Sequence, residues 1–280
     1  MQESGTHRLV SGVRMPRLLY GTAWKQAATA HWVEAALREG FDGIDTAGQP
    51  RHYDEAGVGA GLAAANRDRD ALYLQTKFTP FAGQDPARLP YDPNAPLTTQ
   101  IAQSFARSQS NLRSDYVDAL LLHSPLREAA AQRKAWAAFE ALADAGRVGL
   151  LGISNCYALT QFEQLWREAR VKPSILQNRF YAQTGYDREL RAFCRAHGVI
   201  YQSFWTLSAN PQLLNSATVL ALAAAYERTP AQILFRWLIQ NDVVPLTGTT
   251  SMTHLRQSLD VLAFELDVQD CVAIEALLDT

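Results

Sequence analysis

The sequence predicts a (β/α)8 TIM barrel, in which eight parallel strands close into a ring and helices cover the outside. Three observations support this fold class. Short apolar segments alternate with segments of helical period eight times along the chain. The strand segments are nearly continuous in apolar residues, as in parallel strands that are covered on both sides. No linker or change in composition divides the 280 residues, so we expect one domain spanning residues 1–280.

An N-terminal β-hairpin is expected before the alternation begins. Its two strands are His7–Val10 and Met15–Leu18, and the turn residues Ser11 and Gly12 lie between them. The predicted barrel strands are Leu18–Thr22, Phe41–Asp45, Ala71–Lys77, Tyr116–His123, Val148–Ser154, Ser174–Gln177, Val199–Phe204 and Val243–Leu246.

Helical spacing of apolar residues predicts a helix after each strand and helices at the C-terminus. The expected helices are 28–39, Glu55–Ala65, Leu97–Arg113, Arg127–Ala145, Ala158–Arg170, Asp187–His197, Leu213–Tyr226, Pro230–Ile239, Thr253–Leu262 and Val268–Leu278. Gly40 and Gly198 follow two of them, where glycine commonly ends a helix. The connection Phe78–Pro96 is long for such a barrel, and we expect a semi-rigid lid over the rim.

A doubly wound sheet is the alternative fold. Such a sheet usually has a glycine-rich turn after its first strand, whereas Ala23, Trp24 and Lys25 follow that strand here. The glycine-rich segment GVGAGL at 57–62 does not satisfy GxGxxG and follows a charged loop. We interpret it as small residues that pack a helix against the barrel.

Composition excludes several functional classes. The net charge of -2 does not favour a nucleic-acid or membrane-surface partner. The polar N-terminus and the absence of a long apolar run indicate a cytoplasmic chain with no membrane segment. Cys156, Cys194 and Cys271 are too few for a disulfide framework. The histidines show no ligand spacing, so we expect no metal site.

Polar side chains stand where five of the predicted strands end, and aromatic side chains end a sixth. In a barrel these positions share the C-terminal rim, where active sites lie. They are Asp45, Lys77, His123, Ser154 with Asn155, and Gln177, while the seventh strand ends in Phe204 and Trp205. One such residue alone would fit a turn or helix cap. Their succession predicts a pocket, and the loop residues Trp24 and Phe81 suit its walls as substrate contacts.

The residue types at this rim suit proton transfer to a carbonyl. Tyr53 follows Asp45 by eight residues, and a lysine nearby lowers the pKa of a phenol. An aspartate would hold Lys77 charged, and His123 would orient a carbonyl oxygen. Ser154, Asn155 and Gln177 suit a ligand with a carboxamide, and Phe204 suits a planar ring. His52, beside the tyrosine, is expected at the surface.

Several segments together resemble the aldo-keto reductase family over nearly the whole chain. They are FDGIDTA (41–47), HYDEAGVG (52–59), QTKF (75–78), LLLHSP (120–125), KAWAAFEALADAGRVGLLGISN (134–155), QNRFY (177–181) and VIYQSFW (199–205). Asp54 stands where the family usually has asparagine. The resemblance implies a monomer, or a weak homo-oligomer, that reduces a small aldehyde or ketone with NADPH.

The resemblance also implies residue roles. Tyr53 would be the proton donor, Asp45 and Lys77 would tune it, and His123 would orient the substrate. Cofactor contacts would come from Thr22, Ala23, Ser154, Asn155, Gln177, Phe204, Trp205, Leu207, Gly248, Thr249, Thr250 and Arg256. Thr249, Thr250 and Arg256 are the candidates for the 2′-phosphate. The segment PLTGTTSMTHLRQS (245–258) has no lysine, so NADH remains an alternative cofactor.

Two other functions remain open at this stage. One is a cofactor-binding sensor or regulatory barrel with little turnover. The other is a lyase that forms a Schiff base on Lys77, although the glycine-rich phosphate loops typical of such barrels are missing after the last two strands. The sequence does not identify the substrate.

Overall fold

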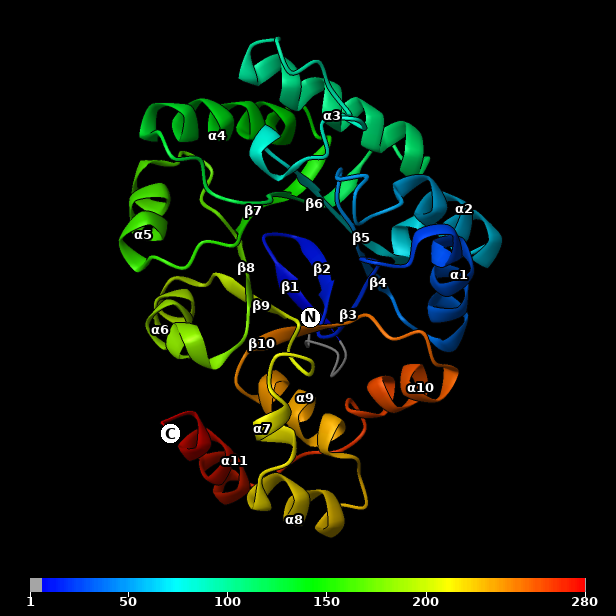
Figure 1. Ribbon diagram of the computed structural model, residues 1–280, viewed down its shortest axis with the longest axis vertical. Helices are drawn as coiled ribbons and strands as arrows, with labels where there is room; N and C mark the ends of the chain where they lie inside the picture. The colour runs from blue at the N-terminus through cyan, green and yellow to red at the C-terminus, as the bar shows by residue number, and fades with distance from the viewer. Residues whose placement is uncertain (1–6, 280) are drawn as a thin grey trace.

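Eight parallel strands form a closed barrel in the computed structural model, which describes residues 7–279 (Figure 1). Neighbours around the ring follow the order β10-β3-β4-β5-β6-β7-β8-β9. The strands are β3 (Leu19–Gly21), β4 (Gly43–Asp45), β5 (Tyr73–Phe78), β6 (Val117–Leu122), β7 (Val148–Ser154), β8 (Ile175–Arg179), β9 (Ile200–Phe204) and β10 (Val243–Thr247). The predicted (β/α)8 barrel is confirmed. Residues 1–6 of the polar N-terminal stretch, and Thr280, lie outside the described residues.

Helices surround the barrel on its outer face (Figure 1). They are α1 (Thr29–Glu39), α2 (Glu55–Ala65), α3 (Leu97–Leu112), α4 (Ala129–Asp144), α5 (Leu159–Glu168), α6 (Arg188–His197), α7 (Pro211–Leu214), α8 (Ala217–Ala225), α9 (Pro230–Gln240), α10 (Met252–Asp260) and α11 (Val268–Glu275). Short 3-10 turns include η1 (Gln26–Ala28), η2 (Arg69–Ala71), η3 (Phe81–Gly83), η4 (Ala182–Asp187) and η5 (Ala276–Asp279). Within residues 7–279, no helix has the length and apolar character needed to cross a membrane.

The helix predicted over Leu213–Tyr226 is two helices, α7 and α8. Ser216 has an extended backbone, and its side chain accepts a hydrogen bond from the backbone N–H of Val219. A serine in this conformation is a favourable N-cap, so it starts a new helix rather than continuing the previous one. The pair Asn215–Ser216 was the sequence signal for this break. It was overlooked because the apolar residues keep their helical spacing across it.

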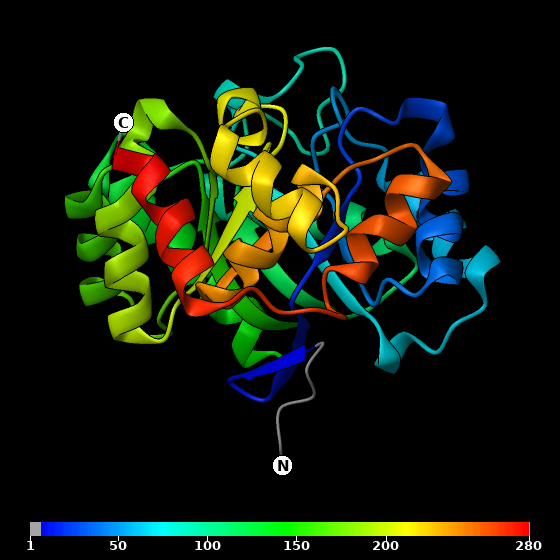
Figure 2. The same ribbon diagram turned by 90° about the horizontal axis from the view of Figure 1, so that it is seen from below.

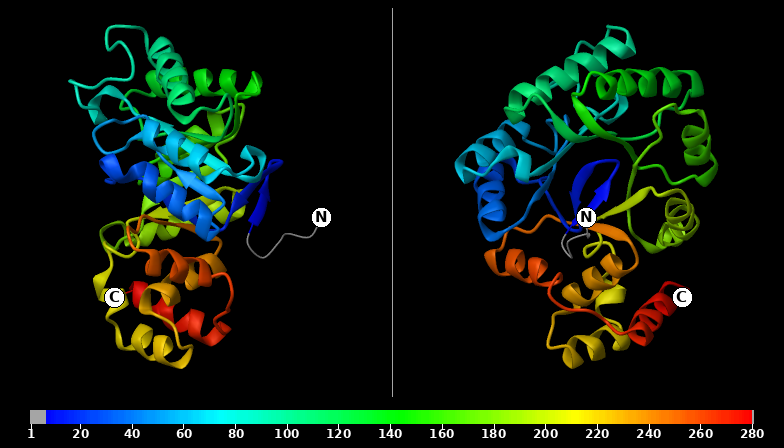
Figure 3. Two further views of the ribbon diagram at one scale, coloured as in Figure 1. Left: turned by 90° about the vertical axis from the view of Figure 1, so that its right-hand side faces the viewer. Right: turned by 180° about the vertical axis from the view of Figure 1, so that it is seen from behind.

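The N-terminal hairpin closes the bottom of the barrel. Strands β1 (His7–Val10) and β2 (Val13–Pro16) pair antiparallel and lie at the end opposite the long loops (Figures 2 and 3). Met15 is fully buried and packs with Leu19 and Tyr73 in the lower core. The hairpin is therefore a plug, and the opposite end of the barrel remains available for a site.

Local interactions shape the segment between β4 and α2. Asp54 caps α2, because its side chain accepts a hydrogen bond from the N–H of Gly57 at 2.9 Å. This cap explains the aspartate where the family usually has asparagine, since both residues are good N-caps. The glycine-rich stretch 57–62 packs α2 against its neighbouring helices. A Cβ at Gly59 would collide with the carbonyl of Asn111, and one at Gly61 would crowd the Ala30 carbonyl. Close helix–helix approach, rather than contact with the barrel, explains these glycines.

Candidate active site

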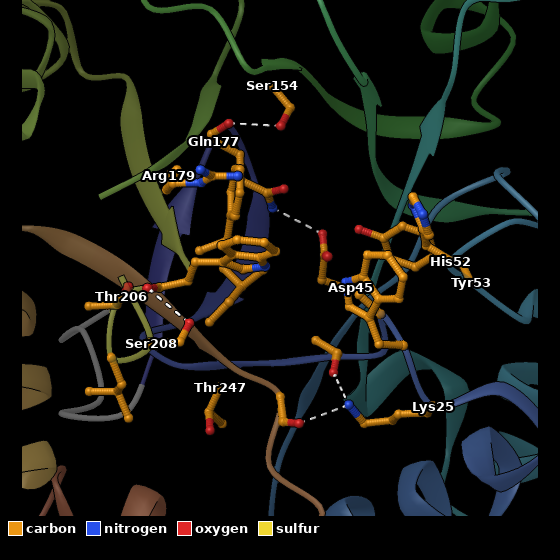
Figure 4. A pocket seen from close by; sticks show the side chains of 18 of the residues that line it. Lys25, Asp45, His52, Tyr53, Ser154, Gln177, Arg179, Thr206, Ser208 and Thr247 are labelled. Carbon is orange, nitrogen blue, oxygen red and sulfur yellow. Dashed lines mark hydrogen bonds between the residues drawn. The ribbon is translucent and has the colours of Figure 1, made fainter. Parts of the chain in front are cut away.

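A cavity of about 660 Å³ opens at the C-terminal rim of the barrel. Its size is that of typical small-molecule sites. Fourteen of the predicted site residues line it, and Figure 4 shows several of them around its centre. They are Ala23, Trp24, Asp45, Tyr53, His123, Ser154, Asn155, Gln177, Phe204, Trp205, Leu207, Gly248, Thr249 and Thr250. The strand ends thus meet as the barrel topology requires.

The remaining predicted site residues do not line this cavity. Lys77 lies behind Asp45, and Thr22 is buried, with its hydroxyl donating to the Asp45 carbonyl at 3.0 Å. Phe81 is 50% exposed in η3 and lies outside the cavity lining, so the structure does not support it as a wall. Arg256 is exposed and makes two hydrogen bonds to the Glu39 carboxylate at 2.8 and 3.0 Å.

The long loop 78–96 is anchored beside the β4–α2 segment. The Gln49 side chain donates to the carbonyl of Gly83 at 2.7 Å, and the Gln84 side chain donates to that of Gly48 at 2.8 Å. Tyr91 is buried against Phe78, with its hydroxyl on the Thr79 carbonyl at 2.9 Å. Tyr91 is therefore an anchor for the loop and not part of a lid surface.

Asp45 and Lys77 form a buried ion pair under the cavity. The ammonium lies 2.6 and 2.7 Å from the two carboxylate oxygens and 2.9 Å from the carbonyl of Thr46. Burial lowers the pKa of Lys77, and the charge and hydrogen bonds of Asp45 act in the opposite direction. A buried pair of this kind depends on full hydrogen bonding, because each charge is costly without the other.

A layer of buried glutamine amides supports this pair. Gln75 and Gln177 donate to Asp45 Oδ1 at 2.6 and 3.0 Å. Gln202 accepts from both amides at 2.9 Å and donates to Gln75 Oε1 at 3.0 Å. The layer crosses the barrel from β5 to β8 and β9, and Figure 4 shows the bond from Gln177 to Asp45. It fixes the direction of the carboxylate.

Tyr53 stands between Lys77 and His123. The Lys77 ammonium is 5.5 Å from the centre of the phenol ring, and the rings of Tyr53 and His123 are 5.9 Å apart. Burial, and then the charge of Asp45, raise the pKa of Tyr53. This corrects the expectation that Lys77 lowers it: Asp45 balances the lysine charge, and burial dominates. The phenol therefore carries its proton at neutral pH.

His123 is a neutral imidazole. Burial, together with the charges of Lys77 and His52, lowers its pKa to about 3. Its Nδ1 lies 2.6 Å from the hydroxyl of Thr79. With the Thr79 hydroxyl as donor, Nδ1 is the acceptor and the ring proton is on Nε2. That tautomer presents an N–H donor.

Hydrogen bonds to the backbone hold Ser154, at the end of β7, and Asn155, which follows it. The Ser154 hydroxyl donates to the backbone carbonyl of Gln177 at 2.8 Å, and the Asn155 amide donates to that of His123 at 2.8 Å. Asn155, Trp24 and Trp205 all have positive φ, at 55°, 65° and 55°. Each non-glycine residue in this region costs about 1–3 kcal/mol, and such strain is concentrated at functional sites.

A sequence model of the Aldo/keto reductase family matches residues 17–279. The chain belongs to the aldo/keto reductase family. It is 27% identical to the glyoxal reductase of Bacillus subtilis (strain 168) over 274 residues, which cover 97% of this chain and 92% of that protein. It is 30% identical to an aldo-keto reductase of Mycolicibacterium vanbaalenii over 246 residues, which cover 88% and 81%.

Solved structures agree with this assignment. An aldo/keto reductase from Brucella melitensis superposes with a TM-score of 0.82 at 27% identity, covering 97% of this chain and 98% of that one. The reductase family acts on small carbonyl compounds and generally uses a nicotinamide cofactor. Carbonyl reduction is therefore the general activity of the family to which this chain belongs.

The structure places cavity residues in this aldo/keto reductase that sequence analysis missed or misplaced. Lys25 is buried, with its ammonium on the carbonyls of Gly21 and Gly248 at 2.9 and 3.0 Å, and burial lowers its pKa to about 8. His52, which was expected at the surface, is partly buried: its ring packs against Trp24 at 3.8 Å and lines the cavity. Arg179 also lines it. Only the alternation of side chains along β8 signalled Arg179.

The part of the chain that the structure describes contains no cluster of metal-ligating side chains. Within residues 7–279, no three His, Cys, Asp or Glu side chains lie close enough together to hold a metal ion. The cavity offers instead donors, a phenol and aromatic rings, which suit an organic cofactor and a carbonyl substrate.

Proposed function

We propose that this protein reduces a small aldehyde or ketone to an alcohol with NADPH, and that Tyr53 is the proton donor. The observation that carries the proposal is a protonated phenol next to a neutral imidazole at the cavity, with the Asp45–Lys77 pair behind the phenol. Neither group is ionised at neutral pH, so both are hydrogen-bond donors to a carbonyl oxygen.

The mechanism follows from these donors. His123 orients the substrate by donating its Nε2 proton to the carbonyl oxygen. Tyr53 then transfers its phenolic proton to that oxygen as negative charge develops on it, and the ammonium of Lys77 stabilises the phenolate that remains. Asp45 acts through Lys77 and does not contact the substrate. A bound nicotinamide cofactor supplies the hydride.

The cavity residues fit such a cofactor. Phe204 provides an aromatic face, and Gln177 provides an amide at the same end of the cavity. Within the described residues, the buried ammonium of Lys25 donates hydrogen bonds to two backbone carbonyls and pairs with no carboxylate. Its charge is therefore available to a diphosphate. Gly248, Thr249 and Thr250 continue the lining beyond it.

We propose NADPH as the preferred cofactor, with NADH also accepted. Thr249 and Thr250 offer hydroxyl groups at the rim, and Arg256 lies on the adjacent helix α10. Arg256 must exchange its bonds to Glu39 to contact a 2′-phosphate. Breaking the exposed Arg256–Glu39 ion pair costs up to about 1 kcal/mol, and this cost reduces the preference for NADPH over NADH.

Short carbonyl compounds are the substrates that we propose. The relatives include proteins named glyoxal reductase, from Bacillus subtilis, and methylglyoxal reductase, from Yersinia pestis. Trp24 and Trp205 lie at the mouth and are 58% and 47% exposed. These rings leave the mouth partly open, which suits a compact substrate that enters after the cofactor.

The test is the oxidation of NADPH and NADH, at equal concentrations, with a panel of aldehydes, ketones and sugars. We expect turnover of short aldehydes and a higher kcat/KM with NADPH. Tight cofactor binding with no turnover across the panel would favour the sensor alternative. Borohydride trapping of a substrate on Lys77 would favour the lyase, but the ion pair with Asp45 keeps this amine protonated and therefore not nucleophilic.

A further inference from the structure

Within the described residues, one cation of the cavity, Arg179, has neither a counter-charge nor a hydrogen-bond partner for its guanidinium. Within residues 7–279, the guanidinium of Arg179 makes no hydrogen bond and no ion pair, and its Nε is buried. Of the described residues that line the cavity, only Asp45 carries a carboxylate, and it is paired with Lys77. A guanidinium without a counter-charge favours an incoming anion, which its terminal N–H groups can bind in a bidentate manner.

The strand β8 directs Arg179 into the cavity. Side chains alternate along a strand, so Arg179 lies on the same face as Gln177, one step closer to the rim. The intervening Asn178 points away and bonds to Asp187 at 2.6 Å and to the Cys156 carbonyl at 2.8 Å. These side-chain hydrogen bonds anchor the end of the strand and fix the origin of the arginine side chain, which Figure 4 shows beside Gln177.

Two aromatic rings hold the guanidinium group. Its central carbon lies 4.2 Å from the ring centre of Trp205 and 5.1 Å from that of Tyr181. Stacking on aromatic faces occupies the plane of an arginine and leaves the N–H groups at its edge free for a planar anion. The group is preorganised, so little side-chain entropy is lost when an anion binds.

We propose that Arg179 binds a carboxylate of the substrate, so that the enzyme prefers aldehydes or ketones that carry a carboxylate. This inference rests on the proposed carbonyl reduction. Arg179 lies at the end of β8, beside the residues that we assign to the carboxamide of the cofactor. Lys25, which we assign to the diphosphate, lies at the ends of β3 and β10. The path of the cofactor therefore leads away from β8, and the anion that reaches Arg179 belongs to the substrate.

The test compares ω-oxo carboxylic acids of increasing chain length with their methyl esters. The measured quantity is the acid-to-ester ratio of kcat/KM. We expect the wild-type ratio to exceed about 10 for at least one chain length, since a charge-assisted bidentate pair supplies that much discrimination. Arg179→Met should bring this ratio close to 1 through a higher KM for the acid. Arg179→Lys should restore part of the ratio.

Controls distinguish a carboxylate site from the other roles of an arginine. Arg51 is an exposed arginine in the β4–α2 segment, so Arg51→Met removes the same charge from outside the cavity lining. An equal fall of the ratio in this variant would mean long-range steering and would overturn the proposal. The Kd for NADPH, measured by quenching of tryptophan fluorescence, should stay unchanged in Arg179→Met. A large rise would assign Arg179 to the cofactor diphosphate instead.

The outcomes also separate this inference from the proposed function. Turnover of the esters with a wild-type ratio near 1 would overturn the carboxylate site and leave carbonyl reduction in place. No turnover of any acid or ester by the wild-type protein would overturn both.

Discussion

Breaking the buried Asp45–Lys77 pair tests the electrostatic core of the site. In Asp45→Asn, the ammonium of Lys77 loses its counter-charge while it stays buried. The destabilisation has an upper limit, because the lysine can give up its proton. The ordinary lysine pKa of ~10.4 lies ~3.4 units above pH 7. At ~1.36 kcal/mol per unit, deprotonating Lys77 at pH 7 costs about 4.6 kcal/mol. Broken buried pairs typically cost about 3–5 kcal/mol, so we expect a value near this limit.

The pH dependence of this cost has a definite sign. The folded-state pKa of Lys77 in the variant lies below its unfolded value, so the unfolded state binds more protons. The cost must therefore shrink as pH rises from ~7 to ~9, by at most about 1.4 kcal/mol per pH unit. In the double variant Asp45→Asn/Lys77→Met both charges are gone. We expect the double variant to be no less stable than either single variant. The sum of the two single losses should then exceed the loss of the double variant by a coupling energy of ~3 kcal/mol or more.

The assay is urea unfolding, followed by circular dichroism and by tryptophan fluorescence at pH 7 and pH 9. Coincident transitions by the two probes are required before a free energy of unfolding is assigned. The reasoning would be refuted if the losses of unfolding free energy in the two single variants simply added in the double variant. It would also be refuted if the loss in Asp45→Asn grew with pH.

Three further predictions concern single groups. Thr79→Val leaves Nδ1 of His123 without its 2.6 Å partner, and kcat should fall about tenfold or more while the Kd for NADPH stays constant. Because the pKa of His123 is about 3, the pH profile of kcat/KM should show no imidazole titration between about pH 5 and 8. An inflection near pH 6.5 that His123→Asn removes would contradict this assignment. Ser216→Ala removes the N-cap of α8 and should lower the free energy of unfolding by about 1 kcal/mol. Ser216→Asp should retain most of the wild-type stability, because aspartate is also a good N-cap.

The strand-end residues were predictable because barrel topology alone decides where they meet. Asp45 and His123 each end an apolar run, and parallel strands bring such ends to one rim. The glutamine layer was not predictable in the same way. Gln75 is level with Asp45, and Gln177 with Gln202, only through the observed strand registers. No local pattern in the sequence encodes those registers.

Loop residues were the least predictable part of the site. Phe81 lies outside the cavity lining, whereas His52 lies in it and packs against Trp24. Both positions depend on how the loops fold over the rim, including the hydrogen bonds of Gln49 and Gln84 that anchor the 78–96 loop. Arg179 was within reach of the sequence, since it follows Gln177 by two residues. The predicted strand ended too early to include it, and β8 continues to Arg179.

The role of Tyr53 as proton donor is the central claim, and the single-turnover rate of Tyr53→Phe tests it most directly. The variant loses only the phenolic hydroxyl, and the ring that packs between Lys77 and His123 remains. With NADPH bound and a reactive short aldehyde added, we predict a loss of about 100-fold or more in the rate of NADPH oxidation. The Kd for NADPH should stay within about twofold of the wild-type value, since the hydroxyl is not a proposed cofactor contact. A rate within a few-fold of wild type would contradict the claim.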